Sequence, residues 1–454
     1  MTIKLSGEIS RRQFLSKSLS GAAGAGLASF SIVGGARAQN AAAKSDIYFP
    51  PPEDQGGWRS INPRDLSGIN AEKLEKTVSF HDQSPISISR GAALLIIHKG
   101  AVIAESYVTG REGGPKNWTA KTCNDMKSST KSVFGTGAGV FLDEFNERVS
   151  LDSLLVGESR ESSLIPQIWD QPITDERKTK IKVKHVLSMT SGHAGPEPWL
   201  GTAKRQHKAG YGGAYQMYEY CFGWWNFEGV LSHERLLFAP GSDFMYSNFG
   251  MEQMALAMRN ISGKTLGEYT YDKVLGPIGM PIGLRNNQYR DMPYSDSFEL
   301  NFADNQGWGV GGSEGCDAYG ADGSKSPYGI NSIAGSTFRC TARDYARLAY
   351  LWLNGGRWKG KQLVPEAWLK LATGRFQRED GSTPNNYGYS FWVMDNLHGV
   401  PKDLFMSRGH NQNHSFIIPS LDLVVVRQGN DNRREFDGVS FETTLIQKIV
   451  EAIS

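Results

Sequence analysis

The sequence predicts a mixed α/β fold of the α+β type, in which both ends of the chain build one antiparallel sheet flanked by helices. Residues 92–97 and 101–107 are apolar runs on either side of Lys99-Gly100, a pattern typical of a buried antiparallel hairpin. Three further strand-like runs come much later, at residues 387–394, 416–418 and 423–427. The long stretch between these regions reads as helices, which favours a helical subdomain inserted into a split sheet.

Helix signals flank and separate the strand regions. Asn70 can cap a helix through about residue 81, because Ile69, Leu74 and Val78 are spaced for one apolar face. Residues 439–453 have the pattern of a closing amphipathic helix. The inserted subdomain is predicted to contain helices at residues 132–145, 183–189, 217–220, 248–260 and 266–274. Residues 302–330 are rich in Gly, Asp, Asn and Ser, which predicts a long loop that could border a site.

The first residues have the features of an export signal. Ser10-Arg11-Arg12-Gln13-Phe14-Leu15 precedes a run of apolar and small residues up to Val33, and Ala36-Arg37-Ala38 supplies a small-x-small end. This pattern predicts a twin-arginine signal cleaved before Gln39, and therefore a periplasmic or secreted bacterial protein. Because glycines interrupt the apolar run, we expect no membrane span in the mature protein.

The length of the chain predicts two subdomains. Without residues 1–38, the chain of 454 residues keeps 416, which is more than a single core usually supports. We expect a linker at residues 39–64 and one domain at residues 65–454. Within it, residues 65–115 and 331–454 are assigned to the sheet subdomain and residues 116–330 to the helical subdomain.

The charge balance excludes some classes of partner. The predicted signal holds five Lys/Arg and one Glu, which leaves 44 basic and 46 acidic residues and a formal charge of −2. This balance does not indicate nucleic acid or an anionic membrane as a partner. Lysines at positions 178, 180, 182 and 184 alternate with Thr, Ile and Val, which predicts the solvent face of a short strand.

The cysteines leave the redox state open. In an oxidising compartment a disulfide is possible, but pairing cannot be read from the sequence, and buried thiols are an equal alternative. No Cys-x-x-Cys occurs among the four cysteines, which are Cys123, Cys221, Cys316 and Cys340.

The chemistry of the chain is expected at its only Ser-x-x-Lys, Ser128-Ser129-Thr130-Lys131, which precedes an apolar helical run. If Ser128 begins a helix, Lys131 lies one turn further on the same face, within reach of the Ser128 hydroxyl. A serine hydroxyl is a weak nucleophile and needs an adjacent base. A lysine can be that base only if its surroundings lower its pKa.

Two later segments could complete a site. Tyr246-Ser247-Asn248 is the only Tyr-x-Asn of the chain and precedes a predicted helix. A lysine ammonium beside Tyr246 would favour its phenolate, which could then accept the Ser128 proton. Residues 407–413, which include His410 and Asn413, precede an apolar strand and would present a polar edge to a substrate carbonyl.

In this order, Ser128-x-x-Lys131, Tyr246-x-Asn248 and Gly409-His410 resemble the three motifs of the serine β-lactamase-like hydrolases. That family includes class C β-lactamases, DD-peptidases, related esterases and oligoamide hydrolases. The likeness covers residues 70–450, and secondary signatures agree with it at residues 186–192, 333–337, 342–344 and 353–356.

The resemblance implies roles for the matched residues on the reacting side. Ser128 would be the acyl-accepting nucleophile, and Lys131 and Tyr246 would be the coupled proton-transfer pair. The backbone N–H groups of Ser128 and Asn413 would form the oxyanion hole, where each donor is worth roughly 3 to 4 kcal/mol of barrier. Acyl transfer would then need no cofactor or metal.

On the substrate side, Asn248 would bind a substrate amide or carbonyl and help to hold Lys131. His410 takes the position where many members carry the Lys of a Lys-Thr-Gly triplet. Gln412 departs from the family pattern, since a small residue is usual there and a side chain could narrow the site. The absence of Lys-Thr-Gly and Ser-Asp-Asn argues against a class A β-lactamase.

We therefore expect an exported serine hydrolase that cleaves a small ester or amide, including β-lactams or D-amino-acid peptides. The alternative is a penicillin-binding or cell-wall-sensing protein of the same fold that does not turn over. Gly311-x-Ser313-x-Gly315 offers a competing nucleophile, but it lacks the strand and helix of a nucleophile elbow. His410 and His414 have the spacing of a metal pair without a predicted helix. The sequence does not indicate the oligomeric state.

Overall fold

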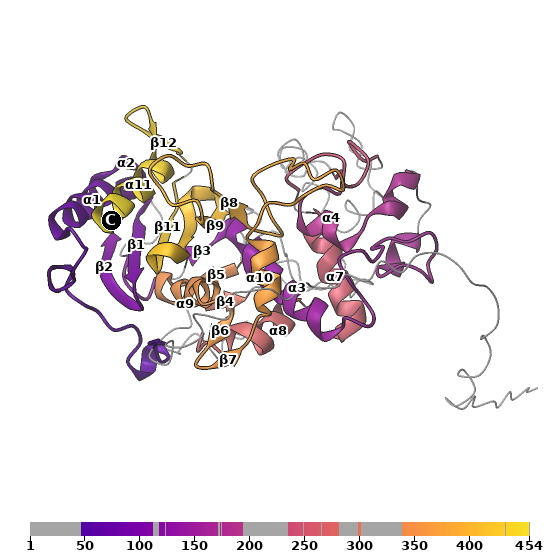
Figure 1. Cartoon of the computed structure of the whole chain (residues 1–454), viewed down its shortest axis with the longest axis horizontal. Coiled ribbons are helices and arrows are strands. Elements are labelled where there is room, and N and C mark those ends of the chain that lie inside the picture. The colour runs from indigo at the N-terminus through magenta and orange to yellow at the C-terminus, as the bar shows by residue number, and fades with distance from the viewer. Residues whose placement is uncertain are drawn as a thin grey trace, which may run out of the picture. The chain divides into compact units, whose positions relative to one another are not determined.

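The computed structural model shows one six-stranded antiparallel sheet with helices on both faces (Figure 1). The structure describes residues 47–111, 118–122, 124–170, 173, 175–193, 235–247, 249–264, 266–280, 298–300, 338–431 and 433–453. The predicted export signal, residues 1–38, lies outside the described residues.

The sheet joins the two ends of the chain, as predicted. Its strand order is β2 (Ala101–Val108), β1 (Ala92–His98), β11 (Leu423–Gly429), β10 (Asn413–Ile418), β9 (Phe405–Gly409) and β8 (Trp392–Val393). The hairpin of β1 and β2 pairs with the late strands through β1 and β11, where Ala92 lies opposite Gly429 and His98 opposite Leu423. The predicted α+β fold with an antiparallel sheet is therefore confirmed.

The edge strand β8 is shorter than the sequence predicted. The strand expected at residues 387–394 is formed only by Trp392 and Val393. Ser390 has a φ of 68°, in the left-handed region, and a residue in that conformation cannot continue an extended strand. The apolar pattern was right about burial, but it does not reveal this turn.

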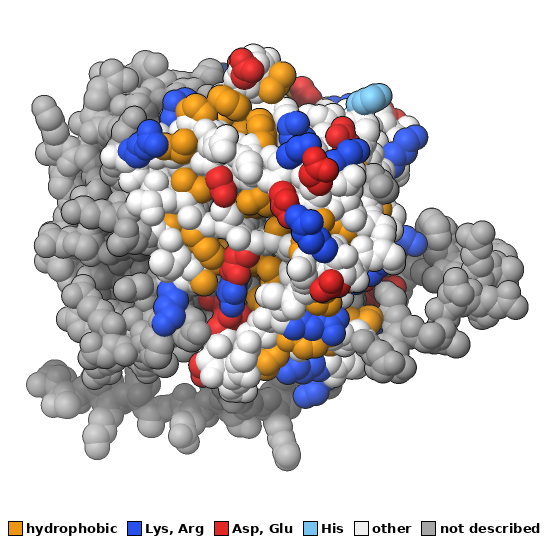
Figure 2. Space-filling view, turned by 90° about the vertical axis from the view of Figure 1, so that its left-hand side faces the viewer, with side chains coloured by type: hydrophobic (Ala, Val, Ile, Leu, Met, Phe, Trp, Pro, Cys, Tyr) orange, Lys and Arg blue, Asp and Glu red, His pale blue; other side chains and the backbone are white. Residues whose placement is uncertain are grey.

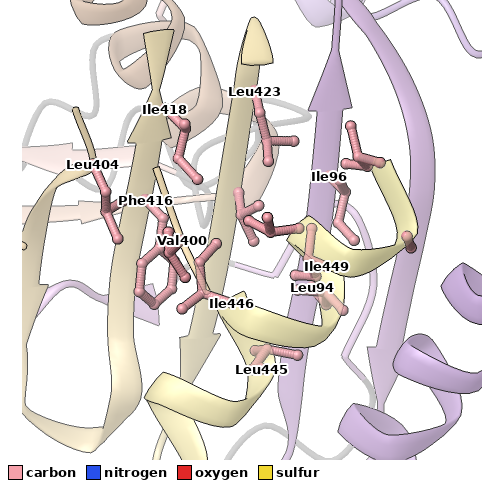
Figure 3. Close-up of a cluster of buried hydrophobic side chains, with 14 of the residues drawn as sticks. Leu94, Ile96, Val400, Leu404, Phe416, Ile418, Leu423, Leu445, Ile446 and Ile449 are labelled. Atoms are coloured by element: carbon pink, nitrogen blue, oxygen red, sulfur yellow. The ribbon is translucent and has the colours of Figure 1, made fainter. Parts of the chain in front are cut away.

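One face of the sheet is covered by α1 (Ala71–Gln83) and α11 (Phe441–Ile453), the first and last long helices. Figure 3 shows Leu445, Ile446 and Ile449 of α11 pointing onto strand residues such as Leu94 and Phe416. Full burial of each such aliphatic side chain contributes about 1.5 to 3 kcal/mol. The Asn70 side chain caps α1 by accepting a hydrogen bond from the Lys73 backbone, so the predicted cap is confirmed.

Helix α2 (Pro85–Arg90) lies on the same face as α1 and α11, since its Ile86 belongs to the buried cluster under α11. The remaining helices lie on the other face of the sheet and beyond it (Figure 1). They are α3 (Thr130–Glu144), α4 (Val183–Leu187), α7 (Phe249–Ser262), α8 (Leu266–Thr270) with a following π turn at Tyr271–Leu275, α9 (Ala342–Leu353) and α10 (Glu366–Ala372). Helices α3, α4, α7 and α8 match predicted helices within a few residues, whereas α2, α9 and α10 were not predicted. The helix predicted at 217–220 lies outside the described residues.

Short elements complete the described part of the chain. Small strands are β3 (Asn124–Asp125), β4 (Phe298–Leu300), β5 (Phe338–Cys340), β6 (Arg357–Trp358), β7 (Lys361–Gln362), β12 (Glu435–Phe436) and β13 (Val439–Ser440). Single 3-10 turns are found at Glu53–Gln55, Pro63–Asp65, Lys127–Ser129, Pro166–Asp170, Glu176–Lys180, His410–Gln412 and Pro419–Leu421.

The alternating lysines do not form a strand face. Residues Glu176–Lys180 form a 3-10 turn that Asp175 caps by accepting a hydrogen bond from the Arg177 backbone, and Lys178 is fully buried. The prediction of a solvent-facing strand at residues 178–184 is thus wrong, because a capping aspartate starts a turn where the alternation suggested extended backbone.

A strap at the N-terminal end of the described chain, residues 48–58, packs against α9. The ring of Phe49 lies 5.8 Å from that of Tyr350 and 4.9 Å from that of Trp358. Glu53 forms ion pairs with Arg343 at 3.1 Å and with Arg347, whose side chain is fully buried, at 2.7 Å. This part of the predicted linker therefore contributes to the packing of the sheet subdomain.

The surface in Figure 2 mixes both signs of charge. Lys and Arg side chains lie among Asp and Glu, with small apolar areas between them, on the face around α1 and α11. No helix within the described residues is both long and apolar enough to span a membrane. Cys340 is buried on β5, and the other three cysteines lie outside the described part of the chain.

Candidate active site

Ser128 lies in a sharp turn between β3 and α3. Asn124 and Asp125 of β3 pair with β5, and the next residue, Met126, donates its backbone N–H to Phe338 at 2.8 Å. Lys127 then adopts a φ of 51°, and the 3-10 turn Lys127–Ser129 leads directly into α3 at Thr130. The turn places Ser128 at the N-terminus of a 15-residue helix, where exposed N–H groups favour developing negative charge.

Lys131 and Tyr246 meet at the Ser128 hydroxyl. The Nζ atom of Lys131, one helical turn further along α3, lies 3.2 Å from the Ser128 Oγ and 4.8 Å from the centroid of the Tyr246 ring. The Tyr246 phenol also interacts with the Ser128 side chain, which acts to lower the pKa of Tyr246. Lys131 is 1% exposed, so its amine is held among protein groups rather than in water. The structure thus brings three of the predicted site residues together.

A loop held by residues 189–190 presents Tyr246. The Met245 N–H donates to the Met189 carbonyl at 2.9 Å, and the Gly241 N–H donates to the Thr190 carbonyl at 2.7 Å. Met189 itself has a φ of 62°. The family signature at residues 186–192 therefore includes a tight turn that fixes the loop carrying Tyr246.

Tyr246 is neutral at neutral pH. Burial raises the pKa of Tyr246 above its usual range, although the interaction with Ser128 and the charge of Arg408 act in the opposite direction. The direction of this shift is opposite to the expectation that the phenolate is favoured, because loss of hydration favours the neutral phenol. A neutral phenol can donate a proton, and the Lys131 Nζ is the basic atom beside the hydroxyl.

Strand β9 approaches the nucleophile turn through its last residue, Gly409. A Cβ atom at this position would lie 2.2 Å from the Met126 carbonyl oxygen and 3.1 Å from the Ser129 nitrogen. Only glycine allows the strand to come this close to the turn. The Ser129 hydroxyl donates to the Asn413 carbonyl at 2.7 Å, which also ties β10 to the turn.

Substitution Gly409→Ala is expected to lower kcat/KM for ester hydrolysis by about 100-fold, because the strand and the turn must separate and misplacement near 1 Å has such a cost. Steady-state kinetics on a p-nitrophenyl ester measures the effect, and circular dichroism checks the fold. Gly374→Ala is the matched control, since its Cβ would meet other atoms only at 3.5 Å or beyond. A Gly409→Ala protein with wild-type kcat/KM would contradict this account of the close approach.

The comparison with protein families agrees with this arrangement. The family model described as Beta-lactamase matches residues 87–443, which is most of the chain. The chain belongs to the beta-lactamase family. No curated protein sequence shows significant similarity to it.

Solved structures share the fold at low sequence identity. A penicillin-binding protein homologue from Caulobacter crescentus is 18% identical with a TM-score of 0.54, over 84% of this chain and 97% of that one. A family VIII carboxylesterase is 16% identical with a TM-score of 0.52, over 86% and 97%. A simvastatin synthase mutant from Aspergillus terreus is 16% identical with a TM-score of 0.56, over 86% and 98%. Family and fold together support a serine hydrolase-type enzyme.

The structure gives less support to the other predicted site residues of this beta-lactamase family chain. Asn248 lies outside the described residues. The His410 side chain is exposed in the turn between β9 and β10. Asn413 is fully buried, and its side-chain amide donates to the carbonyls of His410 at 2.7 Å and Gly429 at 3.0 Å. The oxyanion role of its backbone N–H stays a prediction.

The Gln412 side chain does not narrow the site, as its departure from the family pattern had suggested. Its φ of 63° is left-handed, as expected where relatives carry a small residue. Its side chain is buried and bonds to the Arg433 carbonyl at 2.8 Å and to His414 at 3.0 Å. The close-approach glycine of this edge is Gly409, three residues earlier.

The described residues bear on only one of the two alternative chemistries. The elbow-like segment 311–315 lies outside them. Nowhere in the described ranges do three or more His, Cys, Asp or Glu side chains gather in a metal-binding cluster. His414 is buried and bonded to Gln412 and Glu442, whereas His410 is exposed, so the two do not face one site as a metal pair.

Several groups around the site could not be found from the sequence. Trp392 of β8 stacks on Tyr246, with ring centroids 5.8 Å apart and planes 22° apart. The Tyr345 hydroxyl of α9 donates to Ser407 on β9 at 2.7 Å, behind the nucleophile turn. Neither residue belongs to a recognisable motif, and only the pairing of β8 with β9 and the packing of α9 bring them near.

Proposed function

We propose that this chain is an exported serine hydrolase that cleaves a small ester or amide through an acyl-enzyme on Ser128. The observation that carries the proposal is the placement of Lys131 and Tyr246 on one hydroxyl, with the Lys131 Nζ 3.2 Å from the Ser128 Oγ, in a member of the beta-lactamase family. β-Lactams and D-amino-acid peptides are included in the substrate class. The twin-arginine pattern supports a periplasmic or secreted location.

In the acylation step, the Ser128 Oγ attacks the carbonyl carbon while its proton passes to the pair formed by Lys131 and Tyr246. The carbonyl oxygen becomes an oxyanion, for which the backbone N–H groups of Ser128 and Asn413 are the proposed donors. When the tetrahedral intermediate collapses, the bond to the alcohol or amine breaks and the pair returns the proton to that leaving group. The neutral Tyr246 phenol is suited to this donation.

Deacylation reverses the roles of the reacting groups. Water loses a proton to the Lys131 and Tyr246 pair and attacks the acyl carbon, and the Ser128 Oγ leaves with that proton. The pair therefore titrates as a unit, and its active form is one proton short of the fully protonated state. The exposed His410 and the segment of Asn248 are proposed to contact the substrate and to take no part in proton transfer.

Turnover on a panel of p-nitrophenyl esters, nitrocefin, D-Ala dipeptides and linear oligoamides tests the proposal. We expect steady-state hydrolysis of at least one class, and a loss of about 10⁴-fold or more in kcat for Ser128→Ala. Activity that survives in Ser128→Ala would overturn the assignment. A burst equal to the enzyme concentration without steady-state release would instead support the penicillin-binding or sensing alternative.

A further inference from the structure

An arginine beside the site has no place in the proton-transfer scheme above. Arg408 is the penultimate residue of β9, directly before the close-approach Gly409. Its guanidinium carbon lies 5.6 Å from the centroid of the Trp392 ring, within the range of a cation–π contact. Because Trp392 stacks on Tyr246, the arginine, the indole and the phenol form a continuous series of contacts that ends at Ser128.

Arg408 is held from its other side by buried partners. Its Nε donates to the Glu442 carboxylate at 2.9 Å, and the His414 Nε2 lies 3.1 Å from the same oxygen. The Glu442 and His414 side chains are only 7% and 3% exposed. Burial acts to raise the pKa of Glu442, but His414 and Arg408 outweigh it and bring that pKa to about 2. Glu442 is therefore ionised throughout the range in which a hydrolase is assayed.

The two acceptors beside His414 determine which of its ring nitrogens carries the hydrogen. Its Nε2 faces the Gln412 Oε1 at 3.0 Å and the Glu442 carboxylate, which are both acceptors, so Nε2 carries the hydrogen. Gln412 thereby connects the turn between β9 and β10 to the same carboxylate. The residue that departs from the family pattern is part of the group that holds Arg408.

We propose that Arg408 is a positioning residue that acts on Tyr246 through Trp392, and that Glu442, His414 and Gln412 hold it there. This inference rests on the proposed function, because Tyr246 must take part in proton transfer for Arg408 to affect the rate. The arginine supplies a fixed positive charge near the phenol and a planar surface against the indole. The negative charge of Glu442 partly offsets the charge of Arg408, and its hydrogen bond fixes the orientation of the guanidinium.

The charged and titratable groups that face Tyr246 within the described residues set the sign of the expected effect. They are Lys131 on α3, Arg408 on β9 and Tyr387 before β8. A positive charge favours loss of a proton from the Lys131 and Tyr246 pair, whichever atom gives it up. The rate of Ser128 modification should rise with pH through the apparent pKa of the pair. Removal of Arg408 should move this midpoint to higher pH, and removal of the Glu442 charge should move it to lower pH.

The pH dependence of Ser128 phosphonylation by a fluorophosphonate tests the inference without requiring turnover. We expect the midpoint to rise by about half a pH unit or more in Arg408→Met, to fall in Glu442→Gln and to stay near wild type in Arg408→Lys, which keeps the charge. Arg64→Met is the matched control, since Arg64 pairs with Glu75 on α1 with both side chains more than half exposed. Circular dichroism checks the fold of each variant.

The outcomes separate this inference from the proposed function. If the wild type is not labelled at Ser128, both fail. If the wild type is labelled but Arg408→Met and Glu442→Gln keep its midpoint, even with lower rates, the residues have only a structural role and this inference is overturned. A higher midpoint in Arg408→Met together with a lower midpoint in Glu442→Gln supports the inference, because a purely structural role does not predict opposite shifts.

Discussion

Replacement of Lys131 by methionine is expected to lower kcat/KM for ester hydrolysis by about 10²- to 10⁴-fold, the range for a positioned proton acceptor. The Lys131 Nζ lies 3.2 Å from the Ser128 Oγ, and the described residues place Tyr246 as the other titratable group on that hydroxyl. Methionine fills a similar volume without the amine, so the protein should remain folded, and an unpaired buried charge is not created. Steady-state kinetics at several pH values gives the loss in kcat/KM.

Two variants control this experiment. Lys131→Arg keeps a positive charge but cannot give up its proton, so it should be as inactive as Lys131→Met. Lys178→Met removes the other lysine that is buried to 1% exposure in the described chain and should change stability rather than kcat/KM. If Lys131→Arg retained most of the wild-type activity, the lysine would act only through its charge and its role in proton transfer would be wrong.

Replacement of Glu53 by glutamine is expected to lower the free energy of unfolding by about 3 kcal/mol, since loss of one partner leaves a buried charge uncompensated. Glu53 bonds to Arg347, whose side chain is fully buried, and to Arg343. Asp344 lies 3.8 Å from the Arg347 Nε, and burial raises its pKa to about 7. Loss of the Glu53 charge removes one cause of that rise, so Asp344 offsets only part of the lost ion pair. Urea denaturation followed by tryptophan fluorescence measures the change.

The control for Glu53 is an ion pair on the surface. Glu75→Gln breaks the contact with Arg64, in which both side chains are more than half exposed, and should cost less than about 1 kcal/mol. Equal denaturation midpoints for Glu53→Gln and the wild type would show that the ion pairs of Glu53 do not stabilise the fold.

The fold was largely predictable because its signals are periodic and local. The hairpin of β1 and β2, the Asn70 cap of α1 and the amphipathic pattern of α11 all reflect burial on one face, which a sequence encodes directly. The failures have local causes. Ser390 turns the backbone within a predicted strand, and Asp175 starts a turn within an alternating run. Hydrophobic periodicity reveals neither a positive φ nor a capping geometry.

The contact between Ser128 and Lys131 was predictable because both residues lie in one helical turn. That Tyr246 joins them followed only from the family resemblance, since 115 positions separate it from Lys131. The direction of the Tyr246 pKa shift is opposite to the one expected, because burial of the phenol is a tertiary property that the sequence does not reveal. Arg408, Trp392 and Glu442 come together only through strand pairing and the docking of α11, so no motif could indicate them.

The most direct test of the central claim is the intact mass of the protein after exposure to a fluorophosphonate or a β-lactam, with peptide mapping of the adduct. We predict one adduct on Ser128 in the wild type and none in Ser128→Ala. Ser129→Ala should still be labelled, because the Ser129 hydroxyl is buried and donates to Asn413. No adduct on the wild type, or an adduct that persists in Ser128→Ala, would contradict the account.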